Sequence, residues 1–114
     1  MRREKEIQWV GSSFDDLLAF PDEVRWQAGF QLHKVQSGLE PADWKPFDII
    51  GPGVKEIRIK DPSGAFRVIY VAKFEEAIYV LHCFRKQTQA TAACDTNIVD
   101  TRYRSVLRER GVQR

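Results

Sequence analysis

Positively charged side chains stand inside two segments that otherwise have the sequence of β-strands. Arg67 lies in the apolar run 65–71, and Arg58 lies on the polar side of the alternating run 54–60. Burying a guanidinium costs several kcal/mol unless it is paired or faces water. Either arginine could pair with Glu56, or both could line a concave face that binds phosphate. The sequence alone leaves both interpretations open.

Further groups suited to anions stand at the end of the next apolar run, residues 78–86. Arg85 and Lys86 add two cations, Gln87 adds an amide, and Tyr70 supplies a phenol in the same region. Together with the two arginines, these side chains predict a site for an anion or a nucleic acid. Composition does not say whether such a site cuts its ligand.

Signatures of several other chemistries are missing from the sequence. It contains neither a Gly-rich phosphate loop nor a Gly-x-Ser-x-Gly motif, and His33 and His82 have no ligand at metal-binding spacing. We therefore expect neither a metal ion nor a cofactor. His82 interrupts an apolar strand, which is typical of a hydrogen-bonded core histidine. Two cysteines, Cys83 and Cys94, are too few for a disulfide framework and favour the cytoplasm.

Charge is distributed unevenly along the chain. The 114 residues include 18 Lys and Arg and 16 Asp and Glu, which gives a formal net charge of +2. Residues 1–53 contain six basic and nine acidic side chains, a net of −3, whereas residues 54–114 contain twelve and seven, a net of +5. This asymmetry indicates one basic face and favours a polyanionic partner. No apolar run approaches the roughly 20 residues of a membrane span, so we expect no membrane partner and no secretory signal.

The elements that must position these side chains form one small α+β domain, residues 1–114. A strand is predicted at 7–10, followed by one helix capped at Ser12 or Ser13 and a second capped at Asp22. Pro21 joins the two helices into a helical hairpin. The second helix has its apolar positions at helical spacing, namely Val24, Ala28, Leu32 and Val35.

A packed loop with a short strand is predicted for the Pro- and Gly-rich residues 40–53. Three strands follow at 54–60, 65–74 and 78–86, and their short connections require an antiparallel meander. A last helix runs from residue 91 to about residue 110 and carries a basic face. The predicted order of elements is β-α-α-β-β-β-α.

Three motifs on the three predicted strands resemble a known family. They are GVKEIR at 53–58, FRVIY at 66–70 and IYVLHCFRKQTQ at 78–89. In this order they resemble the phage-derived HigB-like branch of the RelE/ParE toxin superfamily. Its members read approximately Gly-x-Glu-Leu-Arg, then Tyr-Arg-Val-x-Tyr, then a strand ending Phe-x-Lys-Lys before Thr-Pro. The helical hairpin and the Pro-rich loop fit as well, so the resemblance covers nearly the whole chain and implies a RelE-like fold.

The resemblance implies the toxin of a type II toxin–antitoxin system, a metal-independent endoribonuclease that cuts mRNA on the ribosome and inhibits translation. Arg58 and Arg67 match the family arginines and would stabilise the phosphate in the transition state. Lys86 matches the second family lysine and would act as an acid, a base or a fixed charge, and Tyr70 would stack on a base or transfer a proton. Residues that would bind mRNA or ribosomal RNA are Lys60, Arg85, Gln87, Arg102 and Arg108.

The implied protein partner is a helix-turn-helix antitoxin, which we expect to cover the basic groove or to displace the last helix. Two alternatives stay open at this point. The same superfamily contains ParE-like toxins that inhibit gyrase and cleave nothing, because a fold does not fix a target. A catalytically inert, phage-derived binding or regulatory protein is the other alternative.

Overall fold

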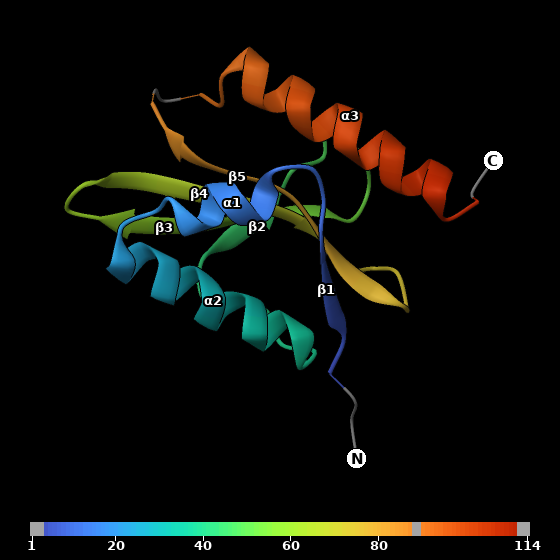
Figure 1. The fold of residues 1–114 in the computed structure, drawn as a ribbon, viewed down its shortest axis with the longest axis horizontal. Coiled ribbons are helices and arrows are strands. Elements are labelled where there is room, and N and C mark those ends of the chain that lie inside the picture. Colours follow the sequence, from blue (N-terminus) through green and yellow to red (C-terminus); the bar gives the residue numbers. More distant parts are fainter. Residues whose placement is uncertain (1–3, 88–89, 112–114) are drawn as a thin grey trace.

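The protein is a five-stranded sheet covered by helices on both faces. The computed structural model describes residues 4–87 and 90–111. The strands are ordered β1-β5-β4-β3-β2. Figure 1 shows this sheet between α3 on one side and α2 on the other. The predicted α+β class, with a helical pair, an antiparallel meander and a C-terminal helix, is confirmed.

The first three elements are β1 (Glu6–Trp9), α1 (Ser13–Leu18) and α2 (Asp22–Gln36). All four apolar positions predicted for α2 are buried against the sheet. Pro21, and not Asp22, is the residue that precedes the first turn, and the fixed φ of proline suits that position. The two helices lie on the same face of the sheet, where α1 packs mainly on β5 and α2 mainly on β3.

The meander consists of β3 (Val54–Asp61), β4 (Gly64–Val71) and β5 (Ala77–Lys86), with the short strand β2 (Trp44–Pro46) at its edge. All of these neighbours pair antiparallel. β4 ends at Val71, before the predicted residue 74, because its partner strand begins at Val54, directly opposite Val71. One irregularity between Ile69 and Tyr70 lets β5 contain an extra residue relative to β4.

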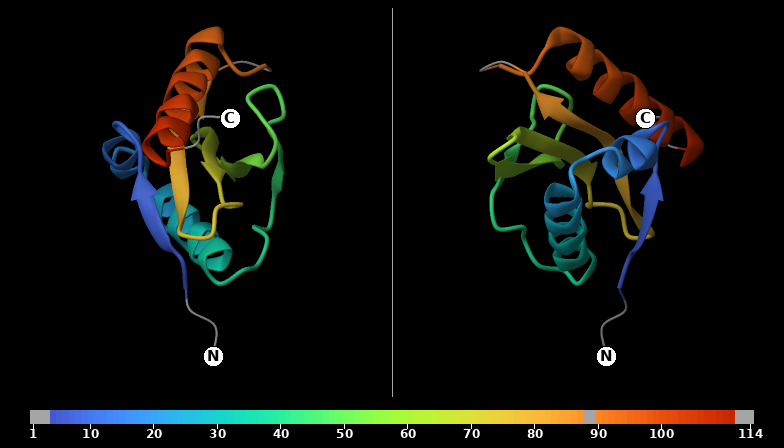
Figure 2. Two further views of the ribbon diagram at one scale, coloured as in Figure 1. Left: turned by 90° about the vertical axis from the view of Figure 1, so that its right-hand side faces the viewer. Right: turned by 60° about the vertical axis from the view of Figure 1, so that its left-hand side comes forward.

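The first strand joins the sheet in a way that the sequence did not predict. β1 pairs with residues 77–80 of β5, and the two strands run parallel. The turned views of Figure 2 show β1 alongside this first half of β5. Beyond Val80 the outer edge of β5 has no strand partner among the described residues.

The last element, α3 (Ala93–Glu109), covers the second face of the sheet. Its buried residues Val99, Tyr103 and Val106 pack on apolar side chains of β4 and β5. The second apolar cluster, under α1 and α2, contains the opposite side chains of the same strands. No helix within the described ranges is long and apolar enough to cross a membrane.

A tight turn between β1 and α1 depends on Gly11, which has φ +58 and whose added Cβ would lie 2.6 Å from Nε of Arg102. Arg102 donates hydrogen bonds to the Leu81 carbonyl and to Oγ of Ser12. Gly11→Ala should therefore lower the free energy of unfolding by about 1–2 kcal/mol, because a left-handed alanine is strained and Arg102 must move. Urea denaturation measures the change.

The matched control is Gly29→Ala in α2. A Cβ at Gly29 meets no atom within 4 Å, and alanine is favoured over glycine inside a helix by about 0.5–1 kcal/mol. This variant should be more stable than the parent protein. Equal destabilisation by both substitutions would contradict the role given to the Gly11 turn.

Candidate functional site

The two strand arginines lie directly opposite each other. Arg58 of β3 pairs in register with Arg67 of β4. Side chains alternate along a strand, so Glu56 and Arg58 share one face while Ile57 and Ile59 pack under α2 on the other. The predicted division of β3 into an apolar and a polar face is confirmed.

The polar face of β3 is buried at Glu56, half-buried at Arg58 and exposed at Lys60. Glu56 is 1% exposed and Arg67 is 6% exposed. Nε of Arg67 lies 3.1 Å from Oε2 of Glu56, and the ammonium of Lys45, from the edge strand β2, lies 3.9 Å from Oε1. The ion pair that the sequence left open is therefore present, and it neutralises part of the charge on this face.

Polar atoms at this face are left without partners. Within the described ranges, Glu56 Oε1, Arg58 Nε and Arg67 Nε are buried and make no hydrogen bond. The Arg67–Glu56 distance is short, but the N–H does not point along it, so the contact is electrostatic only. Unpaired buried donors are costly, and an anion that accepted hydrogen bonds from the two arginine N–H groups would remove that cost.

Lys86, at the end of β5, completes the cluster. Its register partner on β4 is Ala65, two residues from Arg67, and Phe84 of β5 lies opposite Arg67 itself. Lys86 therefore stands on the same face as the two arginines. Its pKa is lowered, first by partial burial and then by the charge of Arg67. We call Lys45, Arg58, Arg67 and Lys86, with Glu56, the cationic cluster.

A histidine and an aspartate flank the cationic cluster. Nε2 of His82 lies 2.8 Å from Oδ1 of Asp95, which belongs to the first turn of α3. The imidazole stacks on Phe84 with ring centroids 4.9 Å apart. The expectation of a hydrogen-bonded core histidine is confirmed. Asp95 could not be predicted as the partner, because no local pattern indicates which strand the start of α3 will contact.

A comparison with known protein families gives one match. The model of a family described as Phage derived protein Gp49-like (DUF891) matches residues 15–104. The chain belongs to this Gp49-like family. No curated protein matches the chain. The matched part of this Gp49-like protein runs from α1 into α3, and it includes every residue of the cationic cluster.

Two residues assigned to the site lie on the opposite face of the Gp49-like sheet. Tyr70 is 1% exposed in the apolar cluster beneath α2, and burial raises the pKa of its phenol. Tyr70 is three residues from Arg67 on one strand, so the two side chains point to opposite faces. Arg85 donates to the Ser63 carbonyl and lies over the Phe66 ring. We leave Tyr70 out of the site.

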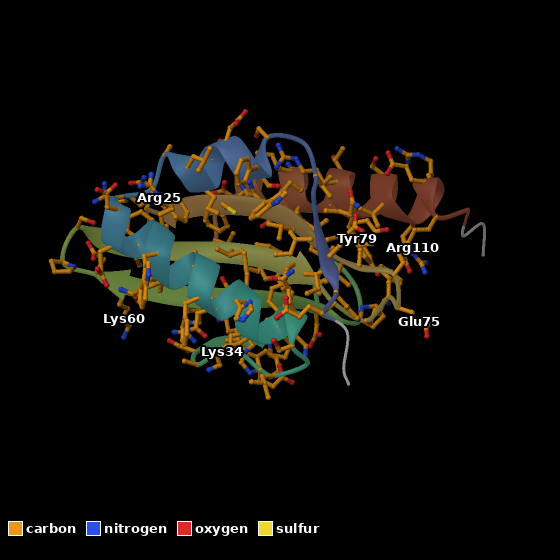
Figure 3. The ribbon with its side chains drawn as sticks, turned by 60° about the horizontal axis from the view of Figure 1, so that its bottom comes forward. Arg25, Lys34, Lys60, Glu75, Tyr79 and Arg110 are labelled. Carbon is orange, nitrogen blue, oxygen red and sulfur yellow. The ribbon has the colours of Figure 1, made fainter. Side chains whose placement is uncertain are left out.

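The remaining residues predicted to bind RNA are spread over the molecule. Lys60 and Gln87 are exposed at the same end of the sheet as Lys86, and Figure 3 shows Lys60 projecting outward near the β3–β4 turn. Arg108 is exposed on α3. Arg102 is held by the Leu81 carbonyl and by Ser12, so its guanidinium links α3 to β5 and α1.

Proposed function

We propose that this Gp49-like protein is the toxin of a type II toxin–antitoxin system and cuts mRNA on the ribosome. The observation that supports this most strongly is the register pairing of Arg58 with Arg67. Like charges directly opposite each other destabilise a sheet. In the cationic cluster one buried carboxylate, Glu56, faces four cations. A phosphate group bound there would supply the missing negative charge.

The chemistry that suits such a site is cleavage of RNA by its own 2′-hydroxyl. Solvent water takes the proton of the 2′-hydroxyl, the 2′ oxygen attacks the adjacent phosphorus and forms a 2′,3′-cyclic phosphate, the bond to the 5′ oxygen breaks, and that oxygen takes up a proton. Arg58 and Arg67 would bind the phosphate oxygens, whose negative charge grows in the transition state. Lys86 would donate the proton to the 5′ oxygen, and a lowered pKa makes a lysine a better donor.

The test is primer extension on a defined mRNA in a reconstituted bacterial translation mixture. We expect the purified protein to produce breaks inside the translated region within minutes, and none in the same mRNA without ribosomes. Breaks without ribosomes would remove the ribosome from the proposal but keep the nuclease. Intact mRNA in both mixtures would contradict the nuclease, and relaxed DNA cut in the presence of gyrase would then favour the gyrase-inhibiting alternative.

The antitoxin is part of the same proposal. A neutralising protein should place acidic side chains over Arg58, Arg67 and Lys86, because this face gathers four cations around one carboxylate. A complex that leaves Arg58 and Lys86 as accessible to solvent as in the free protein would require inhibition by bulk alone.

A further inference from the structure

A cavity of about 530 Å³ opens along the outer edge of β5. This volume is in the range of small-ligand sites. The cavity lies where β5 has passed beyond its partner β1. Its wall is formed by α1, the α1–α2 turn, the β3–β4 turn and β5. Asp16, Phe20, Phe84 and Arg85 contribute to this wall, together with Phe66 of β4.

The cavity adjoins the cationic cluster through β5. Phe84 lines the cavity and also lies opposite Arg67 in the register of β4 and β5. Neighbouring strands are about 5 Å apart, so the cavity wall is one strand away from the proposed phosphate position. Phe20, Phe66 and Cys83 belong to the apolar cluster under α1 and α2, so the cavity and the cationic cluster lie on opposite faces of the sheet, and an RNA strand reaches both by crossing the outer edge of β5 beyond Val80. The two features therefore suit two parts of the same ligand.

The cavity walls have the chemistry of a base-binding site. Phe20 and Phe66 contact each other with ring centroids 4.9 Å apart, and the Arg85 guanidinium lies over Phe66. Aromatic rings and arginine planes are the groups on which unstacked bases pack. Phe20 and Phe66 are 7% and 3% exposed, so the flat surface open to a ring system is that of the exposed Arg85 guanidinium, and polar groups at the rim would select one base.

The rim carries one acceptor and one donor. Asp16 accepts a hydrogen bond from Ser12 at Oδ2, and its Oδ1 has no hydrogen bond within the described ranges. Arg85 uses Nη2 for the Ser63 carbonyl, which leaves its other N–H groups for a ligand. The charge of Asp16 reaches the cavity floor, because after burial it is the next cause that raises the pKa of Cys83, to about 12.

We propose that this cavity binds a guanine base of the RNA whose phosphate lies on the cationic cluster. Guanine presents two N–H donors on one edge, which a carboxylate accepts, and the acceptors O6 and N7, to which arginine donates. Asp16 and Arg85 match these groups. The inference rests on the proposed function, and it makes this cavity the part of the protein that selects the sequence to be cut.

Binding of defined nucleotides tests the cavity separately from cleavage. The probes are GMP, AMP and the RNA pentamers UUGUU and UUAUU, titrated into the purified protein and followed by NMR chemical shifts. We expect UUGUU to bind about 10-fold more tightly than UUAUU, and GMP to bind more tightly than AMP. Equal binding of the two pentamers, or no binding of any probe, would overturn the proposal. Binding of GMP as tight as that of UUGUU would overturn the assignment to RNA.

Variants show which group reads the base. Asp16→Asn should remove the difference between UUGUU and UUAUU, because an amide offers one acceptor and adds a donor toward guanine. Asp15→Asn is the matched control: Asp15 precedes it in α1, is exposed and does not line the cavity, and the 10-fold preference should persist. Loss of preference in both variants, or in neither, contradicts the role of Asp16.

Cleavage and base selection can fail independently. If the protein binds UUGUU selectively but leaves mRNA intact, the nuclease proposal fails and the proposal of guanine binding in the cavity is supported. If mRNA is cut and the ends show guanine no more often than chance beside the break, while the pentamers bind equally, the nuclease stands and the cavity proposal fails.

Discussion

Replacing Lys86 with alanine should lower the rate of mRNA cleavage by about 100-fold or more. Removing one charge-stabilising group from an active site typically has an effect of 10²–10³, and a proton donor contributes a similar factor. Lys86 lies on the face of Arg67, and the lowered pKa of its ammonium suits it to proton transfer. Quantified primer extension at fixed times measures the rate.

Two further variants separate the roles of Lys86. Lys86→Arg keeps the positive charge, but a guanidinium does not release its proton in this pH range. If Lys86 transfers a proton, this variant should bind RNA normally and cut slowly; if it acts as a charge, most of the rate should return. Lys34→Ala is the control, because Lys34 lies on α2, on the other side of the sheet (Figure 3). A loss of rate in Lys34→Ala equal to that in Lys86→Ala would refute a local role.

Glu56→Ala should lower the free energy of unfolding by about 3–5 kcal/mol. Removing one partner of a buried ion pair leaves the other charge uncompensated, and losses of this size are typical. Here the remaining charges are Arg67, which is almost fully buried, and Arg58 directly opposite it. Urea denaturation of the variant and the parent protein gives the difference.

Inorganic phosphate should restore part of this loss. A ligand that binds only the folded state stabilises it in proportion to the logarithm of its concentration. The cationic cluster of the variant has lost its carboxylate, so a phosphate ion meets more uncompensated positive charge there. Phosphate should therefore raise the stability of Glu56→Ala more than that of the parent. The control is Glu40→Ala, which removes an exposed pair with Lys55 and should cost about 1 kcal/mol or less. If Glu56→Ala and Glu40→Ala lowered the free energy of unfolding by similar amounts, the buried pair would contribute no more to stability than the exposed one.

The α+β fold could be predicted because its elements have strong local patterns. The spacing of Val24, Ala28 and Leu32 defines α2, and short turns leave the meander no other topology. The position of β1 could not be predicted in this way. Four residues contain no information about which strand they join or in which direction, and parallel pairing with β5 depends on the whole sheet.

The alternation of side chains along a strand predicts which residues of the candidate site share a face of the sheet, and it predicts no more of the site than that. Arg58 and Arg67 meet because a short turn at Asp61–Gly64 fixes the register. The same rule separates Tyr70 from Arg67, since residues three apart on a strand point to opposite faces. The contact between His82 and Asp95 joins two elements through tertiary packing alone, so no local pattern could have indicated it.

The extra residue in β5 decides which cation stands beside Arg67. With Tyr79 opposite Val71 and no irregularity, simple alternation would bring Cys83 and Arg85 to the face of the arginines and turn Phe84 and Lys86 toward α1 and α2. The bulge shifts the phase of the strand after Val80, so the opposite set is presented. Arg85 and Lys86 are neighbours with the same charge. The bulge places the compact ammonium of Lys86, and not the flat guanidinium of Arg85, on the face of Arg67.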